Sequence, residues 1–358
     1  MGNARNLADN LPVTGASSNR NLIINGGFQV FQRASAVTTV PQGPAGYYST
    51  ADRWKMYSNT GGGTSHTTER STDTPSGSGF SLKSVVTSAN SSLSSGHYAN
   101  IDHYIEAQNC QHLAYGTAAA KTLTVSFFVK SSKTGIYTIA LYKPDTTAYM
   151  YTKEYTINSA NTWEKKTITI TPTAGGTSFI TSSGGAIAND NGLGLGLSFN
   201  QAMGSTFSGG TSDVWGLGSD WNYSTTNAVN WMDTVGNTFY LAEVQLELGS
   251  KATPFEHEPV GVTLSKCQRY YYKWSSSGLS DNIYVRSPYV HGAPNTSASA
   301  AYTFPVTMRA NPTMGGAVGL SLSRFTSSVN NAVAQIGTSG SAGAFSLTAW
   351  EADAELSL

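Results

Sequence analysis

The chain has 358 residues, 39% of them hydrophobic, and 37 glycines, a composition typical of a globular protein and not of a disordered chain. Lysine plus arginine and aspartate plus glutamate each number 21, and charged residues make up only 12% of the sequence. This neutral, charge-poor composition disfavours nucleic-acid binding, which requires a clustered positive field.

No window of the sequence approaches the ~20 apolar residues that a membrane span requires. The first residues also lack the basic and apolar pattern of a secretory signal, so we expect synthesis in a cytoplasm and no membrane insertion. Cys110 and Cys267 are the two cysteines, and one pair is too few for a disulfide scaffold. We expect both to be free, buried thiols.

Residues 1–20 form a polar segment that runs into Pro12 and a Gly-Ala-Ser-Ser stretch. Leu7 and Leu11 are its only large apolar residues, too few to offset the entropy of ordering it alone. We expect an arm that docks on another protein through Arg5, Leu7 and Leu11; a frayed tail is the alternative.

From residue 21 onward, short β-like runs alternate with clusters of Gly, Pro, Ser and Asn. No run sustains a helical period, so residues 21–258 are predicted to form an antiparallel jelly-roll β-sandwich in an all-β protein. Residues 172–232, rich in Gly, Ser and Asn, predict long loops, and 131–134 a hairpin-like connection. The predicted strands are 28–33, 52–57, 121–130, 135–142, 163–171, 193–199 and 239–248.

Two prolines bracket a charged, non-periodic turn at 254–259, which predicts a domain boundary. Residues 260–358 are then a smaller β-rich C-terminal domain. It is predicted to open with a helical turn in 263–274 that leads into an aromatic strand, with later strands at 302–307 and 345–351.

Several segments, in this order, resemble a recurrent module of tailed-phage fibre and other virion surface proteins. They are 21–28 (NLIINGGF) with Gln32 and Arg33, 47–54 (YYSTADRW), 104–109 (YIEAQN), 124–130 (TVSFFVK) and 237–248 (NTFYLAEVQLEL) with 252–256 (ATPFE). The C-terminal part of that family usually begins at a motif like Cys267–Tyr271. The resemblance implies a jelly roll like that of carbohydrate-binding modules.

The resemblance also implies a non-enzymatic structural protein on the surface of a tailed phage, a tail fibre or adhesin that recognises the host surface. Its arm would attach to other virion proteins, a homotrimer is expected, and weak glycan contacts would be multiplied over several copies. A capsid or tail decoration protein that stabilises the particle is one alternative. A glycan depolymerase is another, although the chain contains no recognisable catalytic motif and we assign no catalytic residue.

Aromatic residues in the Gly/Ser/Asn-rich segment are the candidate carbohydrate-binding residues: Trp215, Trp221, Tyr223 and Trp231. A sugar can stack its C–H face on such rings while nearby Asn, Asp and Ser bind its hydroxyls. The alternative is that these rings plug the ends of the sandwich or a subunit interface. The other prominent aromatics, Trp54, Trp163 and Tyr270 to Tyr272, are expected in the core.

The densest group of potential metal ligands matches no zinc signature, so no metal site and no cofactor are predicted. Its members are His97, Asp102, His103, Glu106, Cys110 and His112. A structural calcium ion stays open, because jelly rolls of this kind often hold one, but Gly27 occupies a place where carbohydrate-binding modules often have an acid.

Overall fold

The computed structural model describes residues 20–75, 77–275, 284–285, 298–318, 322–336, 345–346 and 349–356. The predicted arm, with Arg5, Leu7 and Leu11, lies outside these residues. The chain divides into two compact units, one ending at Glu258 and the other running from Pro259 to Ser357. Among the described residues, no helix is both long and apolar enough to cross a membrane.

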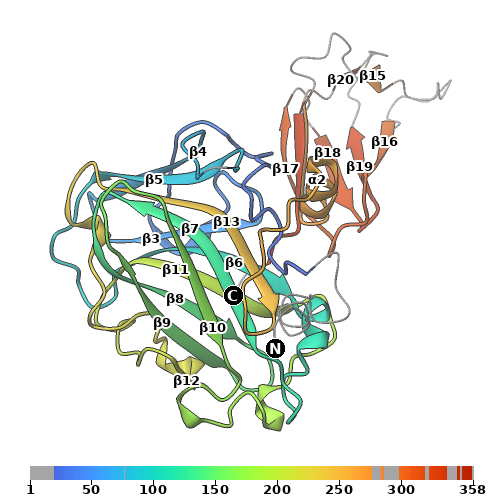
Figure 1. The fold of residues 1–358 in the computed structure, drawn as a ribbon. Helices are drawn as coiled ribbons and strands as arrows, with labels where there is room; N and C mark the ends of the chain where they lie inside the picture. Colours follow the sequence, from blue (N-terminus) through green and yellow to red (C-terminus); the bar gives the residue numbers. More distant parts are fainter. Residues whose placement is uncertain are drawn as a thin grey trace, which may run out of the picture. The chain divides into compact units, whose positions relative to one another are not determined.

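The first unit is a sandwich of two antiparallel sheets (Figure 1). The six-stranded sheet has the order β1 (Thr38–Thr39), β4 (Ser65–Ser71), β5 (Ser81–Ser88), β13 (Thr238–Leu248), β7 (Leu123–Ser131) and β10 (Glu164–Ile170). The seven-stranded sheet has the order β12 (Val214–Leu217), β9 (Tyr149–Ile157), β8 (Gly135–Lys143), β11 (Leu193–Met203), β6 (Tyr98–Glu106), β3 (Trp54–Asn59) and β2 (Gly43–Tyr47). The chain passes repeatedly from one sheet to the other, as in a jelly roll.

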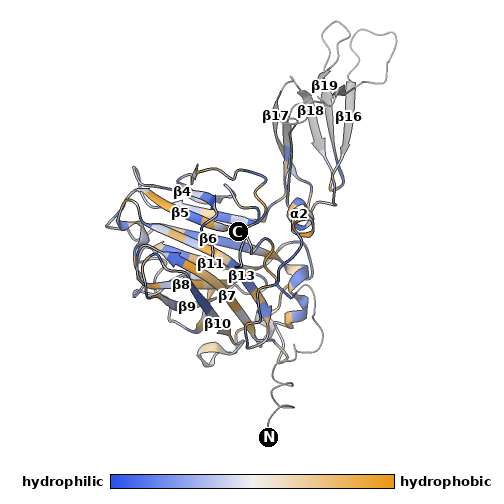
Figure 2. Cartoon of the chain, turned by 45° about the horizontal axis from the view of Figure 1, so that its top comes forward, coloured by the Kyte–Doolittle hydropathy of each residue, from blue (hydrophilic) through white to orange (hydrophobic). Residues whose placement is uncertain are grey.

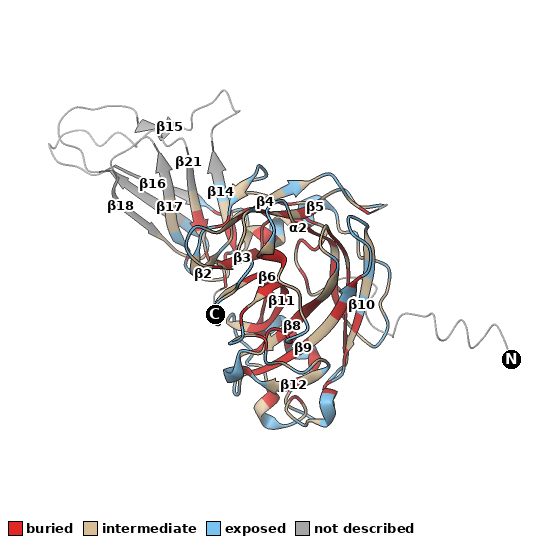
Figure 3. Ribbon diagram, turned by 90° about the vertical axis from the view of Figure 1, so that its left-hand side faces the viewer, coloured by how far each residue is buried: buried red, intermediate tan, exposed pale blue. Residues whose placement is uncertain are grey.

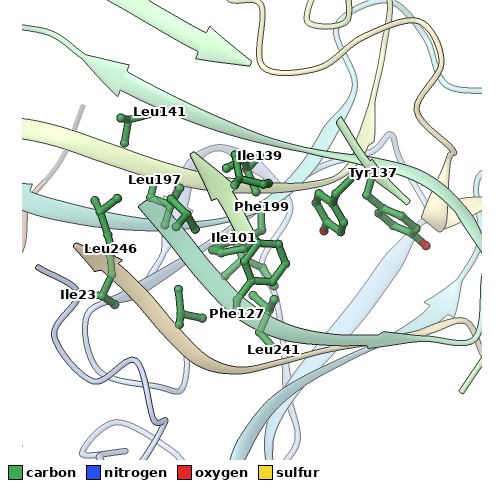
Figure 4. Packing of buried hydrophobic residues seen from close by; sticks show 14 of the residues in the cluster. Ile23, Ile101, Phe127, Tyr137, Ile139, Leu141, Leu197, Phe199, Leu241 and Leu246 are labelled. Atoms are coloured by element: carbon green, nitrogen blue, oxygen red, sulfur yellow. The ribbon is translucent and has the colours of Figure 1, made fainter. Parts of the chain in front are cut away.

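Strand alternation builds the core between the sheets. In β7 the side chains of Val125, Phe127 and Val129 are completely buried, and in β8 Ile139 and Leu141 are too. Figure 4 shows such side chains from both sheets packed together, and Figure 2 shows hydrophobic and hydrophilic residues along the same strands. This period of two is the pattern from which the sequence predicted a sandwich, and the all-β fold is confirmed.

The predicted hairpin at 131–134 is wrong, because the strands on either side of it belong to different sheets. β7 pairs with β10 and β13, whereas β8 pairs with β9 and β11. Gly135, with a φ of 126°, begins β8 in a conformation that other residues rarely adopt. The alternating residues of both strands then face one shared core.

The predicted strand at 28–33 is also wrong, because the Asn25 side chain holds these residues in a compact loop. Its amide accepts hydrogen bonds from the backbone N–H groups of Gln29 and Val30 and donates to the carbonyls of Val30 and Asp52, all between 2.8 and 3.0 Å. Asn25 itself has a φ of 61°, which asparagine tolerates better than most residues. The backbone groups of this loop are satisfied without a sheet partner.

Five short 3-10 helices connect strands in the first unit: η1 (Ala107–Leu113), η2 (Ala174–Gly176), η3 (Ser183–Gly185), η4 (Gly218–Asp220) and η5 (Trp231–Asp233). Within the segment 172–232, η2 to η5 lie beside only two strands, β11 and β12, so the prediction of long loops there holds in large part.

In its described residues, the second unit has one helix and short antiparallel strands. Helix α2 (Val260–Gln268) leads into β14 (Tyr271–Ser275), as the sequence predicted for 263–274. The remaining strands are β15 (Tyr284–Val285), β16 (Ala298–Thr303), β17 (Thr313–Val318), β18 (Leu322–Ser327), β19 (Asn331–Ile336), β20 (Phe345–Ser346) and β21 (Ala349–Asp353). Tyr270 and Tyr271 are buried, while Tyr272 is partly buried against Phe304. Cys267 and, in the first unit, Cys110 are free and buried, as predicted.

Candidate functional site

The seven-stranded sheet has a second face, turned away from the core, that we call the outer face. In β6, Ile101 and Ile105 belong to the core, so the alternate residues Asn100, Asp102 and Tyr104 point outward. Figure 3 shows that β3, β6 and β11 are nevertheless coloured as buried along most of their length. Polar groups on this face are therefore largely shielded from water.

Asp102 is the centre of a hydrogen-bond network on the outer face and is only 2% exposed. The Asn100 amide donates to its Oδ1 over 2.6 Å, and the Tyr104 hydroxyl donates to its Oδ2 over 3.1 Å. The Tyr104 hydroxyl also lies 2.8 Å from that of Tyr57 on β3. On its other side, the Asn100 amide lies 3.2 Å from the Ser198 hydroxyl of β11. That hydroxyl donates to the side-chain oxygen of Asn200 on the same strand.

Burial raises the pKa of Asp102 to about 6, even though hydrogen bonds from Ser198, Asn100 and Tyr104 favour its charged form. The same burial, together with the Asp102 charge, raises the pKa of Tyr57, Tyr104 and Tyr223. A carboxylate held in this way destabilises the folded chain at neutral pH. Buried groups with a strongly shifted pKa cluster at functional sites, so Asp102 marks this face as a candidate site.

A cation approaches the same tyrosines from β3. The Lys55 ammonium lies 5.1 Å from the ring centroid of Tyr57 and 5.7 Å from that of Tyr104, distances at which a cation is attracted by an aromatic face. Its charge also favours the ionised form of Asp102.

The segment after β11 folds back over the outer face and brings an aromatic row to it. The Tyr223 carbonyl accepts hydrogen bonds from the Asn200 amide over 2.6 Å and from the Thr138 hydroxyl over 3.3 Å, which fixes the segment to β11 and β8. The Trp221 ring then stacks between Tyr142 and Tyr223, with centroid distances of 6.3 Å to each. Trp221 remains 42% exposed, so its ring is open to a ligand.

We call this assembly the outer-face cluster. Its members are aromatic or hydrogen-bonding side chains from four segments of the chain: Lys55, Tyr57, Tyr98, Asn100, Asp102, Tyr104, Tyr142, Trp221 and Tyr223. Tyr98 belongs to it because the Asp102 charge contributes to its raised pKa and because its ring lies 6.2 Å from that of Tyr57.

The structure brings Trp221 and Tyr223 together but removes the two other predicted carbohydrate-binding residues from this surface. Trp215 is 1% exposed and donates its indole N–H to the Thr171 carbonyl over 3.0 Å. Trp231 is 0% exposed and packs edge-on against His66. A buried ring has no face for a sugar, and both rings belong to the hydrophobic core.

The expectation that Trp163 lies in the core is wrong. It is partly exposed and lies at the start of β10, outside the core. Trp54 is buried in the core as expected.

The potential metal ligands of β6 do not converge, because Asp102 points outward and His103 points inward. The His103 Nε2 atom lies 3.1 Å from the Ile24 carbonyl. Across the described residues, no three His, Cys, Asp or Glu side chains are placed to share a metal ion.

The sequence analysis missed most of the outer-face cluster. The one available signal was the alternation of polar and aromatic residues in 98–106, opposite an apolar set on the same strand. Asp102 was weighed only as a metal ligand, and its partners lie as far away in sequence as Tyr57 and Ser198.

The cluster has groups suited to binding a sugar, and its carboxylate lies farther from the next buried carboxylate of β6 than the two carboxylates of a glycosidase lie from each other. Aromatic rings, a carboxylate, an amide and an ammonium group complement the C–H faces and hydroxyls of a saccharide. The other buried carboxylate of β6 is Glu106, four residues away, about 13 Å along a strand at 3.3 Å per residue. Glycosidase carboxylates lie about 5–9.5 Å apart.

No family model matches the chain, and no curated protein matches it. Among solved structures, it is similar to the enzymatically active domain of tailspike protein 4 of bacteriophage CBA120, with 13% identity and a TM-score of 0.32 over 64% of this chain and 22% of that one. The chain thus spans about a fifth of the length of that structure. A CBM4 module matches with 15% identity and a TM-score of 0.30 over 63% of this chain and 99% of the module.

The tripod from the baseplate of bacteriophage Tuc2009 matches over 95% of this chain and 91% of its own, with 12% identity and a TM-score of 0.26. The structural neighbours therefore include phage tail proteins and a carbohydrate-binding module. At such low scores these likenesses do not decide the function, which is argued below from the outer-face cluster.

Proposed function

We propose that this chain is a non-enzymatic saccharide-binding protein that uses the outer-face cluster to contact glycans on a host surface. The observation that carries the proposal is the exposed Trp221 ring, which stacks on Tyr223 within a cluster whose buried Asp102 carboxylate accepts a hydrogen bond from the Tyr104 hydroxyl. Trp221 offers a stacking surface, while the buried Asp102 and Asn100 side chains fix the Tyr104 ring of the cluster through their hydrogen bonds.

The place of the protein on a tailed-phage particle, as a fibre or adhesin, rests on the ordered sequence resemblance in 21–256. In this proposal the arm at 1–20 attaches the chain to other virion proteins, and a homotrimer displays several copies of the site. Weak single-site affinity then becomes useful avidity, because linked sites rebind before they separate.

A glycan array probed with the full chain tests the proposal. We expect Trp221→Ala to weaken binding to the recognised glycan by at least tenfold, since covering a large apolar side chain contributes about 1.5–3 kcal/mol. The matched control is Val235→Ala, at a side chain 62% exposed on the turn before β13, which should bind as the wild type does. Equal binding by Trp221→Ala and wild type would contradict the proposal.

A further inference from the structure

The six-stranded sheet also has an outer face, and it carries a second polar and aromatic arrangement. Strand register places Lys130 of β7 opposite Tyr240 of β13, Tyr240 opposite Lys83 of β5, and Lys83 opposite Glu69 of β4. Opposed residues on neighbouring strands point to the same face, so these side chains form one row across the sheet. Trp163 extends the row, with its ring centroid 5.9 Å from that of Tyr240.

Asp73, in the loop after β4, ties Trp163 to Lys130. The Trp163 indole N–H donates to Asp73 Oδ1 over 3.1 Å, and the Lys130 ammonium donates to Asp73 Oδ2. The same ammonium lies 5.1 Å from the ring centroid of Trp163 and 4.2 Å from that of Tyr240. Ring, carboxylate and cation are thus held in one fixed arrangement.

Lys130 and Asp73 differ in exposure, and the carboxylate of Asp73 is the group that a ligand can reach. The Lys130 side chain is 8% exposed, whereas that of Asp73 is 50% exposed. The hydrogen bond from Lys130 lowers the pKa of Asp73, so the carboxylate stays ionised at neutral pH. The Lys130 ammonium is thus largely covered by two rings, while the Asp73 carboxylate remains open to a ligand.

We propose that Trp163, Asp73 and Lys130 form a second saccharide site, on the opposite sheet from the outer-face cluster. A pyranose would stack its C–H face on Trp163, with neighbouring hydroxyls donating to Asp73 and accepting from Lys130. Two lysines and two carboxylates balance along the row, which favours a neutral sugar over a charged one.

The row extends beyond this site toward Glu69. It crosses five strands, a span of roughly 19 Å at the ~4.8 Å spacing of neighbouring strands, which accommodates a short oligosaccharide. The inference takes its class of ligand from the proposed function, while its residues are independent of the outer-face cluster.

Calorimetric titration of the full chain with cellohexaose, xylohexaose and mannohexaose tests this site. We expect two sites per chain in the wild type, one in Trp163→Ala, one in Trp221→Ala and none in the double variant. Asp73→Asn keeps the shape of the side chain at a half-exposed position but removes the charge that pairs with the buried Lys130 ammonium. We expect it to fold, to melt at a lower temperature than the wild type and to bind at least tenfold more weakly at this site.

Each other outcome has a definite meaning. Wild-type stoichiometry and affinity in both Trp163→Ala and Asp73→Asn would overturn the second site, as would loss of all binding in Trp221→Ala alone, which would leave the proposed function in place. Loss of all binding in Trp163→Ala alone would instead contradict the outer-face cluster. A wild type that binds none of the three hexasaccharides would overturn the second site as stated.

Discussion

Asp102 is a residue at which stability and function are expected to oppose each other. Its carboxyl titrates near pH 6 in the folded chain and near 3.8 unfolded, so the folded state loses about 3 kcal/mol of stability as the pH rises through this window. Asp102→Asn removes the buried charge and keeps the side-chain shape. We therefore expect a higher melting temperature at pH 7 together with weaker glycan binding.

Thermal unfolding and the glycan array, applied to the same preparation, measure both effects. Asp190→Asn, on an exposed loop, is the matched control and should change neither. A variant that melts at a lower temperature than the wild type at pH 7 would show that the Asp102 carboxylate stabilises the fold, contrary to this account.

We expect the Asn25 side chain to contribute strongly to the stability of the fold. Its amide makes four hydrogen bonds to the backbone of the loop at 25–30 and to Asp52, and its own carbonyl accepts the Trp54 indole N–H over 3.1 Å. Asn25→Ala leaves buried backbone groups unpaired, so we expect a loss of about 3–5 kcal/mol in the free energy of unfolding in urea. Asn59→Ala, whose side chain makes one exposed hydrogen bond, should lose less than about 1 kcal/mol.

At the scale of elements, β4 meets η5 through His66 and Trp231, whose ring centroids lie 5.7 Å apart. Burial lowers the pKa of His66 to about 4, while the unfolded chain protonates at about 6.5, so folding stability is lost as the pH falls through this window. The loss is about 3 kcal/mol. Asp102 acts in the opposite sense over nearly the same range.

These opposed effects predict opposite variants. His66→Gln should gain stability on acidification from pH 6.5 to 4 relative to the wild type, and Asp102→Asn should lose it, as measured by urea unfolding across this range. Parallel pH profiles for the wild type and both variants would contradict the assignment of these two groups.

The elements that the sequence predicted well are runs in which apolar and polar residues alternate. β7, β8, β10 and β13 appear within two residues of the expected bounds. In β7 and β8 every second residue faces one core, whereas a bulge between Ala242 and Gln245 shifts the alternation within β13. β9 was missed, since its buried positions are tyrosines interleaved with Thr, Lys and Glu. The run at 28–33 alternates too, but Asn25 satisfies its backbone locally.

The candidate site was less predictable, because its geometry depends on distant segments. Trp215, Trp221 and Trp231 lie in the same kind of Gly/Ser/Asn-rich sequence, and only the fold separates the exposed ring from the two buried ones. Asp102 acquires its character from burial and from partners that include Ser198 and Lys55, which neither composition nor spacing connects to it.

The whole molecule consists of a sandwich unit, whose outer sheet faces carry the two proposed saccharide sites, and a separate β-rich unit after Glu258. The arm, the homotrimer and attachment to a phage particle stay predictions. They matter for affinity, because several weak sites held together bind far more tightly than one. The sites themselves, however, are complete within one described unit.

The central claim is that the outer face of the seven-stranded sheet binds saccharides, and a crystal structure of the full chain with its tightest-binding hexasaccharide tests it most directly. We predict a pyranose ring stacked on Trp221, beside the other side chains of the outer-face cluster. A saccharide found only away from these residues, with Trp221 uncovered, would contradict the claim.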